Sequence, residues 1–140
     1  MMVMETWLIL LFWLLVVHCL ADYALQGDFM AKAKNHTASI PGVPWMQALG
    51  AHALIHGGFV AAVTGSVVLG LAEVVCHAVI DYGKSAGWYE FGGRWIPNGP
   101  HSVYRRRCDT QCVARKAYHI DQLLHVTCKV VWVLICVVAS

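Results

Sequence analysis

Four pairs of ionisable residues interrupt the apolar stretches of this sequence, and the two members of each pair are four positions apart. The pairs are His18 with Asp22, His52 with His56, His77 with Asp81, and Asp121 with His125. In an α-helix, residues at this spacing lie one turn apart on the same face, about 6 Å along the axis. Imidazole and carboxylate groups are common ligands of divalent transition metals. The spacing therefore predicts metal ligands that project in pairs from four helices.

These five histidines and three aspartates offer more ligands than one tetrahedral ion needs. Four-helix bundles build di-metal carboxylate sites from such pairs when the side chains project inward. We therefore expect a dinuclear site for Zn²⁺, Mn²⁺ or Fe²⁺, with Ni²⁺ as a further candidate. The three aspartates, Asp22, Asp81 and Asp121, are the candidate catalytic residues, although any of them could instead orient a ligating histidine.

Three other interpretations of the polar residues remain open at this stage. The eight residues could form a polar network that only stabilises the helices. Alternatively, one histidine from each of two facing helices could bind haem, although neighbouring aspartates are unsuited to that role. A separate zinc site could use Cys108 and Cys112 with His101 or His119, but a C-x3-C spacing alone is weak evidence.

The segments that carry the pairs are strongly apolar. Hydrophobic residues make up 59% of the 140 residues and charged residues only 13%, which is typical of membrane proteins. Four segments approach the roughly 20 residues that are needed to span about 30 Å of hydrocarbon. We expect helices at about 5–27, 44–64, 66–84 and 117–139, with a basic loop at 85–116, in a single domain covering 1–140. The predicted fold class is all-α: a four-helix transmembrane bundle with up-down-up-down topology.

The basic residues predict the orientation of this bundle. Nine of the ten lysines and arginines follow the first or the third helix, and such residues mark the cytoplasmic side of a membrane. We therefore place both chain termini outside the cytoplasm and the basic loops inside it. Because successive helices reverse direction, all four polar pairs then fall toward the cytoplasmic side at similar depth. The net charge of +2 gives no support for nucleic-acid binding.

Two further ionisable residues extend the polar columns. Glu73 lies one turn beyond His77, and Lys129 lies one turn beyond His125. An unpaired charge inside a membrane helix is costly, whereas an ion pair neutralises both groups. We predict a buried Glu73–Lys129 pair, which either sets the register of the helices or serves as a proton relay or anion site next to the metals.

Several stretches of the chain also resemble a known family. They are His18 to Gln26 (HCLADYALQ), Met30 to Lys32 (MAK), Lys34-Asn35, the His52/His56 helix, His77 to Lys84 (HAVIDYGK) and Asp121 to His125 (DQLLH). Together they resemble the domain-of-unknown-function 3307 family of bacterial and phage membrane proteins, over nearly the whole chain. Residues 88–116 lie outside the matching motifs. The resemblance implies a small multi-pass protein of the bacterial inner membrane and brings no established activity. A looser similarity of layout points to membrane-bound metal-dependent hydrolases.

Two functional classes follow from these features. The first is a membrane-embedded metal-dependent hydrolase, in which two ions activate water and a lipid-linked or phosphate-bearing substrate enters from the cytoplasmic leaflet. Four polar residues are the expected entry contacts: Gln26, Lys32, Lys84 and Gln122. The second is a metal-ion or proton transporter or sensor, which would need a hydrated path through the outer half of the bundle. That half is almost wholly apolar, so the hydrolase is favoured.

Two further expectations concern partners. A non-enzymatic phage membrane protein, whose metal only stabilises the fold, remains an alternative. The lipid bilayer is the expected surrounding, and a homodimer would be required if a single copy left the polar residues exposed to lipid.

Overall fold

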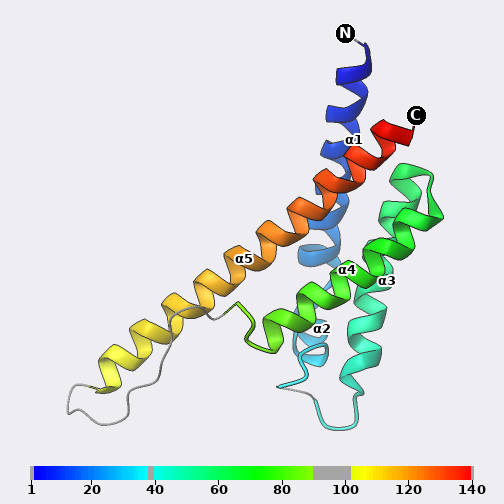
Figure 1. The fold of residues 1–140 in the computed structure, drawn as a ribbon. Helices are drawn as coiled ribbons and strands as arrows, with labels where there is room; N and C mark the ends of the chain where they lie inside the picture. Colours follow the sequence, from blue (N-terminus) through cyan, green and yellow to red (C-terminus); the bar gives the residue numbers. More distant parts are fainter. Residues whose placement is uncertain (1, 38–39, 90–101, 140) are drawn as a thin grey trace.

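The computed structural model describes the backbone of residues 2–37, 40–89 and 102–139, and the side chains of 5–37, 40–89 and 115–139. Every regular element in these ranges is a helix (Figure 1). The elements are α1 (Met2–Cys19), the π-helix η1 (Leu20–Leu25), α2 (Gly27–Ala33), α3 (Trp45–Thr64), α4 (Val67–Ser85) and α5 (Ser102–Ala139). The all-α fold class is therefore confirmed for the described part of the chain.

Three helical segments are long and apolar enough to cross a membrane. They are Glu5–Leu25, Trp45–Thr64 and Arg115–Ala139, with mean hydropathies of 2.2, 1.3 and 2.0. Their 20 to 25 residues match the thickness of a hydrocarbon core. The fourth long helix, α4, has 19 residues but is not among them, because it carries Glu73, Asp81 and Lys84.

The helices bury polar side chains and expose apolar ones. Among the residues whose side chains are described, nine polar or charged ones are buried: His18, His52, His56, Glu73, His77, Asp81, Asp121, His125 and Lys129. Large hydrophobic side chains cover the outside, where Leu8, Phe12 and Leu123 are 64%, 59% and 64% exposed. Water would solvate such a surface poorly, whereas lipid covers it at no cost. This inverted distribution agrees with helices that lie in a membrane.

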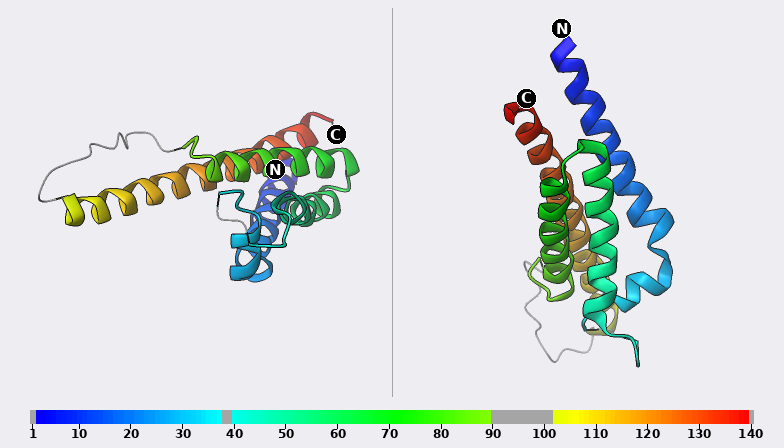
Figure 2. Two further views of the ribbon diagram at one scale, coloured as in Figure 1. Left: turned by 90° about the horizontal axis from the view of Figure 1, so that it is seen from below. Right: turned by 90° about the vertical axis from the view of Figure 1, so that its right-hand side faces the viewer.

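Each of the long helices packs against two others. Helix α3 contacts α4 and α1, and helix α5 contacts α4 and α1. The right-hand view of Figure 2 shows α1 beside α3 and α3 beside α4. The N-terminus, the C-terminus and the α3–α4 turn lie toward one end of the molecule, and α2 lies toward the other (Figure 1).

Close contact between α3 and α4 follows from two glycines. A Cβ atom on Gly70 would lie 2.7 Å from both Cβ of Ala61 and the carbonyl oxygen of Gly57, which is closer than real Cβ atoms approach. Small residues at such a contact allow two helix backbones to approach. The turn that joins the helices is equally tight, because Gly65 adopts φ 69° and the Ser66 side chain accepts a hydrogen bond from the backbone N–H of Leu69. The hairpin thereby sets the depth of the α3 side chains relative to those of α4.

The first helix differs from the prediction. We expected one α-helix at 5–27, but α1 ends at Cys19 and the chain continues as the π-helix η1. The chain then turns at Gly27, which has φ 56°, into the short helix α2, and neither η1 nor α2 was predicted. In a π-helix the hydrogen bond joins residues five apart rather than four, so the side chains that follow are rotated. Asp22 lies in this π-helix.

The predicted basic loop at 85–116 is also partly wrong. Helix α5 begins at Ser102 instead of near residue 117, so the C-terminal part of that segment is helical. Its sequence is rich in arginine, and arginine, lysine, alanine and glutamine all favour helices, so positive charge was a poor sign of a loop. The backbone of 90–101, and the side chains of Cys108, Cys112 and His101 that could form a separate zinc site, lie outside the described residues.

An apolar core fills the half of the molecule nearer the termini. It consists of Leu14, Val60, Leu69, Trp132 and Val133, which are all at most 8% exposed. These side chains come from α1, α3, α4 and α5. The buried histidines and aspartates lie on the side of this core that is farther from the termini, in a polar layer across the helices.

Candidate metal centre

The eight residues that we expected to bind metal converge in this polar layer. They form three overlapping groups in which one donor atom from each residue lies within 4.8 Å of every other: Asp22, His52, His56 and His77; His18, His77 and His125; and Asp81, Asp121 and His125. Together the groups contain all eight residues. We call this set the His/Asp belt.

The helix geometry explains how the belt assembles. Each helix supplies one i,i+4 pair: α1 and η1 carry the first, α3 the second, α4 the third and α5 the fourth. Packing then brings the pairs together, since the ring centroids of His56 and His77 are 3.6 Å apart and those of His77 and His125 are 4.2 Å apart. The Nδ1 atoms of His18 and His56 approach to 3.3 Å, which leaves no space for a haem between these two rings.

Several buried atoms of the belt have no hydrogen-bond partner within the described part of the chain. They are Nε2 of His18, Nε2 of His52, both ring nitrogens of His77, Nδ1 of His125 and Oδ1 of Asp121. A buried polar atom without a partner costs about 1–3 kcal/mol, so such atoms in a native protein call for an explanation. Neutral imidazole nitrogens and a carboxylate oxygen are suitable donors for a divalent transition metal.

The spacing of these donors also fits metal ions. Two ligand atoms on opposite sides of an ion, each at about 2.1 Å, lie about 4.2 Å apart. The donor atoms of each group lie within 4.8 Å, so small rotations of the side chains would bring them into bonding range. The first and third groups share no residue, and each could therefore hold its own ion.

Asp81 connects the two groups. Its Oδ2 lies 3.5 Å from Nε2 of His52 and 3.6 Å from Nε2 of His77, which both belong to the first group. Its Oδ1 lies 3.6 Å from Nε2 of His125, which belongs to the third. Asp81 could therefore offer an oxygen to each of the two groups if ions bind there.

Asp22 reaches across to helix α3. Its Oδ1 lies 3.1 Å from Nε2 of His56 and 3.4 Å from Nε2 of His52, while its Oδ2 lies 3.4 Å from Nε2 of His18. Asp22 lies in the π-helix η1 and joins the first group together with both α3 histidines.

Two lysines donate hydrogen bonds to the other two aspartates. Lys34 donates to Oδ2 of Asp81 and to Oε1 of Gln26, both at 2.6 Å. Lys84 donates to Oδ2 of Asp121 at 2.8 Å. Sequence reasoning did not place Lys34 in the site. The signal that could have found it is its place in the Lys34-Asn35 motif, which follows the polar end of the first predicted helix within a few residues.

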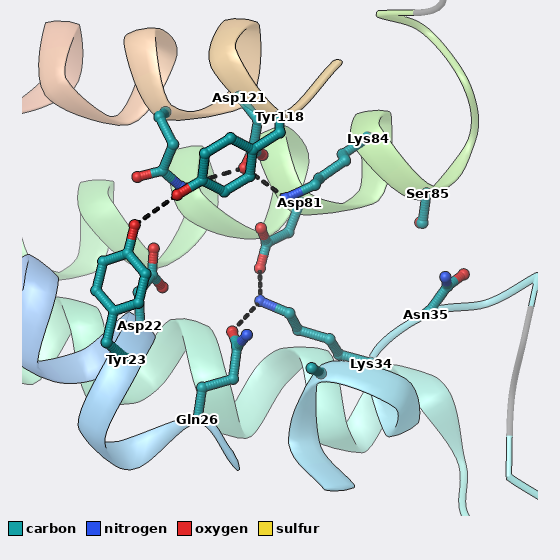
Figure 3. Close-up of a pocket in the computed structure, with 12 residues that line it drawn as sticks. Asp22, Tyr23, Gln26, Lys34, Asn35, Asp81, Lys84, Ser85, Tyr118 and Asp121 are labelled. Carbon is teal, nitrogen blue, oxygen red and sulfur yellow. Dashed lines mark hydrogen bonds and ion pairs between the residues drawn. The ribbon is translucent and has the colours of Figure 1, made fainter. Parts of the chain in front are cut away.

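A cavity of about 240 Å³ opens beside these lysines (Figure 3). Its lining residues are Asp22, Tyr23, Gln26, Ala31, Lys34, Asn35, Asp81, Lys84, Ser85, Tyr118, Asp121 and Gln122. All three candidate catalytic aspartates face it. Of the four expected entry residues, Gln26, Lys84 and Gln122 line the cavity, whereas Lys32 is exposed on α2 and does not. The tyrosines were not predicted, and they bridge η1 and α5, with 2.5 Å between the hydroxyls of Tyr23 and Tyr118.

A separate ion pair lies between the belt and the apolar core. Lys129 donates to Oε1 of Glu73, and both side chains are only 1% exposed. Trp132 Nε1 donates to the other oxygen, Oε2, at 2.6 Å. Oε1 of Glu73 also lies 3.4 Å from Nδ1 of His77. Glu73 therefore lies next to a belt histidine while it accepts hydrogen bonds from a lysine and from the core tryptophan.

One neighbouring group lies beyond the helices. The Tyr89 hydroxyl donates to the carbonyl oxygen of Ile80 at 3.1 Å, so the chain after α4 folds back over the end of that helix. Burial, together with the negative charges of Asp121 and Asp81, raises the pKa of Tyr89. Tyr89 consequently remains a neutral hydrogen-bond donor near the aspartates.

The fold and the belt describe an all-α protein with membrane-length helices around a buried cluster of histidines and aspartates. Comparison with known families agrees with the resemblance noted from the motifs. The family model described as "Protein of unknown function (DUF3307)" matches residues 10–140, and the chain belongs to that family. The match includes all four polar pairs. Neither a curated protein nor a solved structure matches the chain.

Proposed function

We propose that this chain is an integral membrane protein that binds two divalent metal ions in the His/Asp belt and acts as a membrane-embedded metal-dependent hydrolase. The observation that carries the proposal is the convergence of eight ligand residues from four helices, several with buried donor atoms that have no partner in the described chain. Zn²⁺, Mn²⁺ and Fe²⁺ all suit this mixture of imidazole and carboxylate groups.

The proposal includes α4 as a fourth transmembrane helix in an up-down-up-down bundle. The charged Glu73 and Asp81 on α4 are buried against other helices, whereas Val68 and Leu71 on its outer face are 75% and 60% exposed. Charged residues in membrane helices are tolerated when they face the interior and are paired. Hairpin partners α3 and α4 are nearly equal in length, at 20 and 19 residues, so α4 can cross the same hydrocarbon layer.

The orientation in the bacterial inner membrane follows from the basic residues. Lys34 and Lys84 lie at the cavity end of the helices, so that end faces the cytoplasm and both termini lie outside it. A single chain buries the five belt histidines to 4% exposure or less, so a second copy is not needed to shield them from lipid.

Hydrolysis is the reaction that the site supports best. Two bound ions would supply Lewis-acid activation of substrate and water. Asp22, Asp81 and Asp121 line the cavity with carboxylate oxygens, and any of them that is not ligating could accept a proton from the attacking water. The phosphate-bearing or lipid-linked substrate expected from the sequence would reach them from the cytoplasmic leaflet.

A transport function is less well supported. A carrier needs a polar path on both sides of its binding site. On the side away from the cavity, the belt is followed by the Glu73–Lys129 pair and then by the apolar core around Leu14 and Trp132. The site is therefore closed in that direction.

Metal analysis of the detergent-purified protein tests the proposal. We expect about two equivalents of Zn, Mn or Fe by mass spectrometry, as in dinuclear bundle sites. The double substitution His56→Ala, His77→Ala should abolish binding, and His119→Ala, an exposed histidine on α5, should not. Failure to bind any of the three metals after reconstitution would refute the metal centre. Metal binding without hydrolysis across a panel of phosphoesters and lipid-linked substrates would instead indicate a structural or sensing role.

A further inference from the structure

The polar cavity beside the belt contains more positive charge than metal binding requires. Its lining has three aspartates, two lysines, three amide side chains and three hydroxyl groups. Each lysine is bonded to an aspartate that belongs to the third group of metal ligands. In the protein without metal, these lysines can be explained simply as counter-charges for buried carboxylates.

Metal binding changes this balance. The five charged residues around the cavity carry one more negative than positive charge. Two divalent ions would neutralise the aspartates and leave the positive charges of Lys34 and Lys84 without a counter-charge. A partly buried cation that loses its counter-charge is unfavourable unless an anion takes its place. The loaded site should therefore attract an anionic group into the cavity.

Building on the proposed metal centre, we propose that this cavity is a binding site for a phosphate monoester group, which Lys34 and Lys84 hold beside the metals. A phosphate monoester carries close to two negative charges at neutral pH and has three strong acceptor oxygens. Several donors converge on the cavity, so a phosphate can satisfy more of them, and more positive charge, than a carboxylate can.

Both lysines have donor capacity left for such a ligand. A lysine ammonium has three N–H donors. Within the described chain, Lys34 uses two of them, on Gln26 and Asp81, and Lys84 uses one, on Asp121. The side chain of Lys34 is 14% exposed and that of Lys84 is 39% exposed, so one lies inside the cavity and the other near its opening. Figure 3 shows them on two sides of the same space.

The size and position of the cavity favour a headgroup over a whole lipid. Its volume of about 240 Å³ is below the roughly 300–1,000 Å³ typical of pockets that enclose a drug-sized ligand. Tyr23 and Tyr118 line it at the surface, where they are 65% and 39% exposed. Leu20 and Leu25, on the same π-helix as Tyr23, are 44% and 51% exposed and would face lipid chains. The phosphate could belong to a lipid headgroup or to a soluble molecule, and the chemistry at the lysines would be the same.

Phosphate binding by the metal-loaded full-length protein in detergent tests this inference. The probes are inorganic phosphate and mixed micelles that contain phosphatidic acid, with phosphatidylcholine micelles as the diester comparison, and binding is measured by calorimetry. Metal content is measured first in every sample. The variants are Lys34→Met and Lys84→Met, and Lys32→Met is the matched control, because Lys32 is exposed and lies outside the cavity.

We expect the wild type and Lys32→Met to bind phosphate, and each cavity variant to bind it at least about tenfold more weakly. The reason is that the free energy of one hydrogen bond to a charged group is larger than the free energy that corresponds to a tenfold change in affinity. Binding of inorganic phosphate alone would indicate a soluble source, and binding of phosphatidic acid micelles a lipid source. Removal of the metals should abolish both. If one cavity variant loses metal through its contact with Asp81 or Asp121, the variant that keeps its metal decides the outcome.

Two results would overturn the inference. In the first, the wild type holds two metals but binds neither probe. In the second, the cavity variants keep their metals and bind phosphate as tightly as Lys32→Met does. Either result would exclude the lysines as a phosphate site while leaving the metal centre intact. A wild type that binds no metal would refute the metal centre, and this inference with it.

Discussion

Replacing Lys129 by methionine should destabilise the protein severely, although Lys129 is not among the proposed metal ligands. The substitution keeps the length of the side chain but removes the partner of Glu73, and both residues are 1% exposed. Removing one partner of a buried ion pair typically costs about 3–5 kcal/mol, because the remaining charge is left buried. Trp132 still donates to Glu73 and recovers part of this cost. We therefore expect a loss near the lower end of that range.

The converse change, Glu73→Gln, should cost a similar amount, since it leaves the Lys129 ammonium without a counter-charge. Combining the two changes removes both charges, so the double variant should be much more stable than the sum of the single losses predicts. Thermal unfolding in detergent, followed by circular dichroism, measures these differences. For a chain of this length, about 3 kcal/mol corresponds to a decrease of about 10 °C in the midpoint.

Val130→Met is the control for the insertion of methionine into the same helix, because Val130 is 40% exposed and lies next to Lys129. It should leave the midpoint nearly unchanged. A loss below about 1 kcal/mol for Lys129→Met, the value typical of an exposed ion pair, would contradict the burial argument. Strictly additive losses in the double variant would show that Glu73 and Lys129 do not stabilise one another.

Two further predictions test the belt and the packing that aligns it. Asp81→Asn should lower the bound metal from about two equivalents to one or fewer, because Asp81 approaches both groups of ligands. The control is Asp28→Asn, since Asp28 is an exposed aspartate on α2. This variant should bind as much metal as the wild type in the same mass-spectrometric assay. Gly70→Ala should reduce stability by about 1–3 kcal/mol, as overpacking does, because its Cβ would lie 2.7 Å from Ala61 Cβ. Gly50→Ala, where a Cβ meets nothing within 4 Å, should be neutral or stabilising, and equal melting temperatures for these two variants would contradict the close α3–α4 contact.

The composition of the belt could be predicted because it depends on local geometry. Residues four apart share one face of a helix wherever the helix packs, so the polar pairs and the extension of one column to Glu73 were visible in the sequence. The apolar stretches likewise indicated membrane-length helices, since the required length is set by the bilayer. Membership of the family was also recognisable from the sequence, because the motifs of the family are short and contiguous.

Local sequence patterns did not predict the structure where the backbone departs from the α-helix, or where a charged segment was taken for a loop. Nothing in residues 20–25 distinguishes a π-helix from an α-helix, so η1 could not be foreseen, although Asp22 was expected among the ligands. The beginning of α5 was missed because its arginine-rich sequence was interpreted as a loop, although arginine favours helices.

The sequence by itself determined which residues share a face of each helix, and therefore which side chains were available for a site. Only the tertiary structure decided which faces meet. Lys34 contacts Asp81, 47 positions away, and Tyr23 contacts Tyr118, 95 positions away. Such contacts depend on how closely the helices approach, as at Gly70, and on where the chain turns, as at Gly27. Helical periodicity acts within one helix, whereas the cavity and its two lysines arise from packing between helices.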